Sequence, residues 1–215
     1  AGGKIAKEKQ ITDLNENFAG KPTGKIDIIQ WKGANDEIVE GILSYPLNWK
    51  QGEKRPLILM PHGGPAAASL DQWTSSWAEP FIIWRQKGAF TLEPNYHGSA
   101  NYGLDWVESI GHGHYYDLEI PDLEKGVDAL IARGLVDPDK LGVGGWSNGG
   151  ILSADIITKD QRFKVASVGA ADVEWLSDWA NVDFGAGFDN YYFGGPPWEN
   201  IDTYIKKSPF FRLAK

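Results

Sequence analysis

The 215-residue sequence contains no cysteine, so the protein has no disulfide bond and no cysteine nucleophile. No apolar run approaches the length needed to cross a bilayer, and no secretion signal is visible. The strongly basic stripe typical of nucleic-acid-binding proteins is missing as well. We therefore expect a soluble globular chain with no nucleic-acid partner and no membrane span. The composition does not indicate the compartment.

Charge is distributed unevenly along the chain. The formal net charge is −8, and residues 117–202 carry 16 acidic against 6 basic side chains. Such a segment is typical of a solvated acidic face. It would also favour peptides with a free amino terminus as ligands. The hydrophobic content of 42% is enough for a substantial core.

The most informative motif is Gly145-x-Ser147-x-Gly149, the nucleophile-elbow pattern. It follows an apolar run at residues 141–144 and precedes a helical pattern at residues 148–158. Small residues are needed on both sides of the serine because the turn is tight and the helix packs closely against the strand. A dinucleotide-binding turn would need a third glycine at position 147, and a P-loop would need Gly-Lys-Ser/Thr. The pattern therefore favours acyl transfer through Ser147.

A second motif, His62-Gly63-Gly64-Pro65, follows the apolar strand predicted at residues 57–60. A His-Gly-Gly loop after a strand supplies one oxyanion-hole N–H in lipases and esterases, and the residue after the nucleophile supplies the other. Here these donors are the backbone amides of Gly64 and Asn148. For His62 we favour a role in bracing this loop over a role in proton transfer, because the chain order Ser, acid, His argues against the latter.

A third segment, residues 94–103 (PNYHGSANYG), completes an ordered set of motifs. Together with HGGP at 62–65, the elbow, and YFGGP at 192–196 leading to Ser208-Pro209, it resembles the prolyl oligopeptidase family of serine peptidases. The similarity runs from about residue 26 to residue 208 and is closest to the acylaminoacyl peptidase and dipeptidyl peptidase IV branches. Family members usually carry arginine where His97 stands.

The resemblance implies an α/β-hydrolase fold with a mostly parallel sheet and helices on both faces. It also implies a β-propeller domain that limits access to oligopeptide substrates, and self-association into homo-oligomers. All four histidines precede Ser147, whereas the family's triad acid and histidine lie beyond the Ser-Pro that matches Ser208-Pro209. We therefore expect a fragment: residues 1–22 would be an extension from a propeller, and residues 23–215 would be the nucleophile half of the hydrolase domain.

Other residues give weaker signals. By position after the elbow, Trp175 and Tyr192 match residues that line the substrate pocket in dipeptidyl peptidase IV, but they could equally be core aromatics. His112 and His114 have a spacing that could hold a metal, yet no cysteine or carboxylate pattern completes a site, so we expect no metal and no cofactor. Four acids follow the elbow, and the resemblance places none of them as the triad acid: Asp172, Asp178, Asp183 and Asp189.

The pattern of apolar and turn residues predicts strands and helices that alternate from residue 57 onward, as in a mostly parallel sheet covered on both faces. The predicted strands are 26–31, 38–45, 57–60, 89–93, 141–145 and 165–168, the first two forming a hairpin. The predicted helices are 80–87, 121–133 and 148–158.

These observations predict a serine peptidase that hydrolyses oligopeptides through an acyl-enzyme on Ser147, with little activity in the 215-residue chain alone. Two alternatives remain. One is a carboxylesterase of the same fold, and the other is a hydrolase-fold protein that binds without catalysis.

Overall fold

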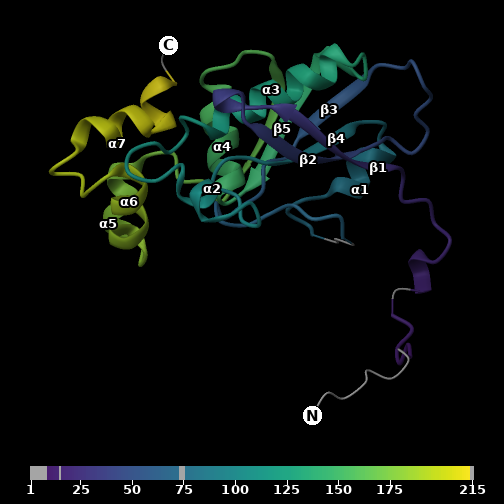
Figure 1. The fold of residues 1–215 in the computed structure, drawn as a ribbon, viewed down its shortest axis with the longest axis horizontal. Helices are drawn as coiled ribbons and strands as arrows, with labels where there is room; N and C mark the ends of the chain where they lie inside the picture. The colour runs from purple at the N-terminus through teal and green to yellow at the C-terminus, as the bar shows by residue number, and fades with distance from the viewer. Residues whose placement is uncertain (1–8, 15, 73–75, 214–215) are drawn as a thin grey trace.

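A computed structural model describes residues 9–14, 16–72 and 76–213. Six strands form one mixed sheet in the order β1-β2-β4-β3-β5-β6 (Figure 1). Their bounds are Ile26–Lys32 (β1), Ile38–Ser44 (β2), Arg55–Leu59 (β3), Phe90–Asn95 (β4), Val136–Trp146 (β5) and Phe163–Gly169 (β6).

The first two strands form the predicted hairpin, and the rest of the sheet is largely parallel. β1 pairs antiparallel with β2, and β2 pairs antiparallel with β4. The pairs β3–β4, β3–β5 and β5–β6 are parallel. The carboxyl ends of β3, β5 and β6 therefore meet at one edge, which is where ligands bind in sheets of this kind. The prediction of a mostly parallel sheet of the α/β-hydrolase type is confirmed.

Helices cover both faces of the sheet, as the alternating sequence pattern predicts. Leu92 of β4 points toward Gly126 of α3, where a Cβ would come within 3.2 Å of the leucine. The next residue, Glu93, points to the opposite face and interacts with Arg85 of α1. The helices are Phe81–Gln86 (α1), Leu104–Glu108 (α2), Glu119–Ala132 (α3), Asn148–Ile157 (α4), Trp175–Asn181 (α5), Gly185–Phe193 (α6) and Ile201–Lys207 (α7). Short 3₁₀ segments occupy Glu16–Phe18, Ala34–Asp36 and Pro209–Arg212.

The last three helices, α5 to α7, were not predicted from the sequence. They lie together beside the carboxyl end of the sheet, at the left of Figure 1. Each has only seven to nine residues, which is too short for a clear periodic pattern. Their contacts are mainly aromatic: Trp175, Phe193 and Tyr204 are fully buried, and the ring centroids of Phe193 and Tyr204 lie 4.8 Å apart.

The main core lies between the sheet and helices α3 and α4. Leu57, Leu59 and Leu92 from the strands and Leu123 and Val127 from α3 are completely buried. Within the described residues, no helix is both long and apolar enough to cross a membrane.

Candidate active site

Ser147 occupies a sharp turn between β5 and α4. Its backbone has φ 54° and ψ −124°, a conformation that costs a non-glycine residue about 1–3 kcal/mol. Its N–H donates to the carbonyl of Gly169 on β6 over 3.0 Å, and its carbonyl accepts from the N–H of Ile151 over 2.9 Å. The serine is solvent-exposed. The fold thus holds the strained turn on both sides and presents the hydroxyl to a ligand.

Close backbone packing explains the glycines of the motif. A Cβ on Gly149 would come within 2.0 Å of the carbonyl oxygen of Pro61, at the end of the strand that precedes the His-Gly-Gly loop. A Cβ on Gly145 would lie 2.5 Å from the backbone of Gly149. Neither position can carry a side chain unless the backbone moves.

The His-Gly-Gly loop lies directly against the elbow. A Cβ on Gly63 would be 3.5 Å from the Cβ of Ser147, and Gly64 has φ 130°, which favours glycine. Gly64, Ser147 and Asn148 line one cavity of about 250 Å³. The structure therefore brings together the three residues that the sequence placed in the nucleophile and oxyanion roles. The other lining residues are Ile151, Asp172, Phe184 and Phe188.

The side chain of Asn148 is held by two buried tyrosines. Its Nδ2 donates to the hydroxyl of Tyr96 over 2.9 Å, and the Tyr115 hydroxyl donates to its Oδ1. The Tyr96 hydroxyl in turn donates to the carbonyl of His62 over 2.6 Å. Burial raises the pKa of both tyrosines, so they remain protonated donors. Tyr96 thus connects the residue after the nucleophile to the His-Gly-Gly loop, a contact that the sequence did not reveal.

The ring of His62 is fixed inside its own loop. Its Nδ1 lies 2.7 Å from the carbonyl of Gly63 and its Nε2 lies 2.8 Å from the hydroxyl of Ser99, while the ring stacks on Tyr96 at 4.4 Å. Burial lowers the pKa of His62 to about 4. A neutral ring satisfies both contacts, with Nδ1–H donating and Nε2 accepting. These contacts support the interpretation that His62 braces the loop.

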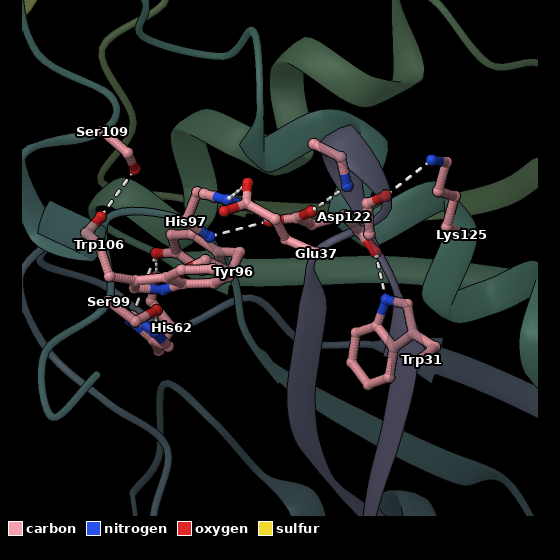
Figure 2. Close-up of polar contacts among 12 residues, drawn as sticks. Trp31, Glu37, His62, Tyr96, His97, Ser99, Trp106, Ser109, Asp122 and Lys125 are labelled. Carbon is pink, nitrogen blue, oxygen red and sulfur yellow. Dashed lines mark hydrogen bonds and ion pairs between the residues drawn. The ribbon is translucent and has the colours of Figure 1, made fainter. Parts of the chain in front are cut away.

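His97 lies between two carboxylates, as Figure 2 shows. Its Nδ1 is 2.6 Å from Oδ2 of Asp122 and its Nε2 is 3.0 Å from Oε2 of Glu37, and the ring stacks on Trp106 at 3.8 Å. Burial opposes a charge on this ring. The hydrogen bonds and charges of Asp122 and Glu37 outweigh that effect and raise the pKa of His97.

Asp122 is the centre of this arrangement. Its Oδ2 also accepts from the backbone N–H of His97 over 2.8 Å, and its Oδ1 accepts from the N–H of Ala34 over 2.7 Å. These contacts tie helix α3 to the β1–β2 turn and to the loop after β4. We call Asp122, His97, Glu37 and Ala34 the Asp122 network.

The aromatic residues predicted to line the pocket pack behind its wall. Trp175 is fully buried and its Nε1 donates to the hydroxyl of Tyr116 over 3.0 Å. Tyr192 is 8% exposed. Both contact Phe188, with ring centroids 6.3 Å and 4.5 Å away, and Phe188 itself lines the cavity.

Four cavity residues were not assigned to the pocket from the sequence: Ile151, Asp172, Phe184 and Phe188. Asp172 follows β6, the neighbour of the elbow strand β5, and the carboxyl ends of parallel neighbours converge. That signal could have identified it. Phe184 lies immediately before α6 and Phe188 lies on it. This helix is too short to be recognised from its sequence pattern.

His112 and His114 show no metal-binding arrangement. His112 packs on Tyr191, and His114 lies 3.7 Å from Asp117 at the surface. Among the residues that the structure describes, no group of three or more histidine or acidic side chains could hold a metal ion. In the same part of the chain, no hydrogen bond joins a histidine to the Ser147 hydroxyl.

Comparison with known proteins gives concordant matches. The profile of the prolyl oligopeptidase family matches residues 73–215. The chain is 29% identical over 204 residues to the uncharacterized peptidase YuxL of Bacillus subtilis, covering 94% of this chain and 30% of that protein. It is 26% identical over 182 residues to acylamino-acid-releasing enzyme 1 of Oryza sativa, covering 79% of this chain and 22% of that protein.

Among solved structures, an acylaminoacyl peptidase of Pyrococcus horikoshii superposes with a TM-score of 0.83 at 27% identity, covering 95% of this chain and 32% of that one. The chain therefore spans a third or less of the length of each of these proteins.

Proposed function

The chain belongs to the prolyl oligopeptidase family, and on that premise we propose that its gene product is a serine peptidase that hydrolyses oligopeptides through an acyl-enzyme on Ser147. Similar proteins include acylamino-acid-releasing enzymes and an acylaminoacyl peptidase, which supports peptides as the substrate class. The observation that carries the proposal is the exposed, strained Ser147 in one cavity with Gly64 and Asn148.

In the proposed reaction the Ser147 hydroxyl attacks the scissile carbonyl and loses its proton to a histidine. The resemblance places that histidine, and the aspartate that orients it, beyond residue 215. The carbonyl oxygen becomes negative in the tetrahedral intermediate and accepts from the backbone N–H groups of Gly64 and Asn148. Asn148 begins helix α4, so the positive end of the helix dipole also favours that negative charge.

The remaining parts of the proposal concern the rest of the protein. Residues 23–215 are the nucleophile half of the catalytic domain, and residues 1–22 lead into it from a β-propeller domain that selects oligopeptides by size. The greater length of the similar proteins is consistent with further domains. Self-association into homo-oligomers is part of the same proposal, and light scattering of the gene product tests it.

A fluorophosphonate probe tests the nucleophile directly. We expect the complete gene product to be labelled covalently and Ser147→Ala to be unlabelled, because the probe reacts only with an activated serine. Ser177→Ala, at an exposed serine on α5, serves as the matched control and should label normally. Undiminished labelling of Ser147→Ala would place the nucleophile elsewhere.

Matched peptide and ester substrates separate the alternatives. A peptidase should cleave acyl-peptides with a higher kcat/KM than short acyl esters. Preference for the short esters would favour a carboxylesterase. A folded gene product that neither labels nor hydrolyses would favour a binding protein of the same fold.

A further inference from the structure

Three aspartates form a row that leads from the Ser147 cavity into the protein. Asp172, in the loop after β6, lines the cavity. The carboxyl of Asp178 on α5 lies within hydrogen-bonding reach of the carboxyls of both Asp172 and Asp189, the latter on α6. We call these three residues the aspartate row. They come from three different elements, so the fold itself places them together.

The inner members of the aspartate row lack hydrogen-bond donors. Asp178 is 6% exposed and Asp189 is completely buried. Within the described part of the chain, neither oxygen of Asp189 nor Oδ2 of Asp178 accepts a hydrogen bond from a donor group. Buried carboxylates are normally paired with cations or with several N–H groups because burying an unpaired charge is costly. An arrangement of unpaired buried acids therefore indicates a missing positive partner.

The titration of the row supports this view. Burial, together with the neighbouring Asp172 carboxyl, raises the pKa of Asp178 to about 7, and burial with the charge of Asp178 raises that of Asp189 to about 8. Within the described residues, Glu174, before α5, and the hydroxyl of Tyr204 on α7 also interact with this pair. None of these groups is cationic, so near neutral pH Asp178 and Asp189 hold protons in place of a positive partner.

The walls of the cavity suit a cationic side chain with an aliphatic stem. Among the described residues, those that line it include no lysine, arginine or histidine, whereas Phe184 and Phe188 supply two aromatic rings. Aromatic faces attract ammonium and guanidinium groups and pack against the methylene groups that carry them. Because Asp172 and Ser147 line the same cavity, a substrate attacked by Ser147 can place a side chain near its scissile bond beside Asp172.

We propose that the aspartate row is a specificity subsite that binds the lysine or arginine side chain on the acyl side of the scissile bond, with Asp172 in contact with the cation. This inference rests on the proposed peptidase function and adds its substrate class. Asp178 and Asp189 act behind Asp172: when a cation binds at Asp172, the Asp178 carboxyl ionises and releases its proton to solvent, so the charges balance.

The test compares acylated aminomethylcoumarin substrates that differ only in the residue before the scissile bond: arginine, lysine, norleucine and glutamate. For the complete gene product we expect kcat/KM for arginine and lysine to exceed that for norleucine by about tenfold or more, since a charge pair at a half-buried site is lost with norleucine. The advantage should grow as pH rises through about 7, where Asp178 ionises. Glutamate should be the poorest substrate.

Asp172→Asn keeps the shape of the side chain and removes its charge. It should lower kcat/KM for arginine to near that for norleucine, a much larger fold-change than any it causes with norleucine itself. Asp183→Asn, at an exposed acid between α5 and α6, is the matched control and should keep the preference. Asp178→Asn should retain a preference for arginine but lose the increase of that preference as pH rises through about 7, which separates a direct contact from an indirect one.

The outcomes distinguish this inference from the proposed function. Fluorophosphonate labelling of each variant confirms that the active site is folded. Labelling and peptide hydrolysis without a preference for arginine or lysine would overturn the subsite and leave the peptidase intact. A preference that survives Asp172→Asn would also overturn it. Preference for a free amino terminus over the acylated form, independent of the side chain, would show that the row binds the substrate's terminal amine instead.

Discussion

The Asp122 network and the aspartate row are both built from buried carboxyls, but they differ in their hydrogen-bond donors. Asp122 is fully buried and accepts from two backbone N–H groups and from His97. Asp189 is equally buried and accepts from no donor among the described residues. An aspartate side chain thus holds three segments together at position 122, whereas at position 189 it has no hydrogen-bond donor among the described residues. The supply of donors, rather than burial, distinguishes the two regions.

Removing the centre of the Asp122 network should have the largest effect on stability. Asp122→Ala leaves the ring of His97 and the N–H groups of Ala34 and His97 without their acceptor. We expect a loss of about 3–5 kcal/mol, the usual result of breaking a buried ion pair on one side. Urea unfolding of the gene product measures it, with Asp183→Ala as the control. A loss below that of the control would mean that Asp122 is not a structural tie.

The pH dependence of stability should show contributions from both regions. The pKa values of Asp178, Asp189 and His97 are raised in the folded protein. A group whose pKa is raised by folding stabilises the folded protein. Its contribution is complete below the pKa of the unfolded chain and is lost as pH rises through the pKa of the folded protein. The free energy of unfolding should therefore fall between about pH 4 and pH 8 because of the two aspartates, by up to about 1.4 kcal/mol per pH unit for each proton. His97 should add to this fall from about pH 6.5 upward. Unfolding free energies measured from pH 4 to pH 9 check this slope, and a rise over that range would contradict it.

Replacing Asp189 should increase the free energy of unfolding, whereas replacing Asp122 should decrease it. Asp189→Asn removes a buried carboxyl that loses its hydration on folding and accepts no hydrogen bond from the described residues. The amide of the new asparagine can donate to Asp178. We expect the unfolding free energy at pH 8 to increase by about 1 kcal/mol. The same measurement at pH 4, where Asp189 of the unmodified folded protein is protonated and therefore uncharged, should show a smaller difference. A decrease at pH 8 would indicate that Asp189 has a partner in the complete protein.

His97→Arg should give the smallest change in stability. Arginine keeps its charge over the whole range, can pair with both Asp122 and Glu37, and can stack on Trp106. We expect a change below about 1 kcal/mol at pH 6 and the loss of the His97 contribution to the slope above pH 6.5. A slope identical to that of the unmodified protein would show that His97 does not titrate in that range.

Much of the sheet could be predicted because its signals are local. The hairpin, the strands from Arg55 onward and the elbow at Ser147 each follow from an apolar run and the turn residues beside it. The strand β5 begins earlier than predicted, at Val136, because residues 136–140 read as a loop and are placed by pairing with Arg55. The family was indicated by four ordered motifs, which depend on sequence alone.

The contacts that complete the site could not be predicted in the same way. The aspartate row joins Asp172, Asp178 and Asp189 from three elements, two of them on short helices without a clear pattern. The bonds from Tyr96 and Tyr115 to Asn148 link residues 52 and 33 positions apart. Such contacts depend on how the elements pack, which no spacing within one segment specifies.

The position of Tyr96 has a consequence for how the two oxyanion donors respond to a ligand. Its hydroxyl bridges the backbone at His62 and the side chain of Asn148, so a shift in either segment pulls on the other. In the proposed mechanism the spacing between the amides of Gly64 and Asn148 is then fixed before any substrate arrives. A carbonyl oxygen that becomes negative between these amides then gains its hydrogen bonds with little reorganisation of the protein.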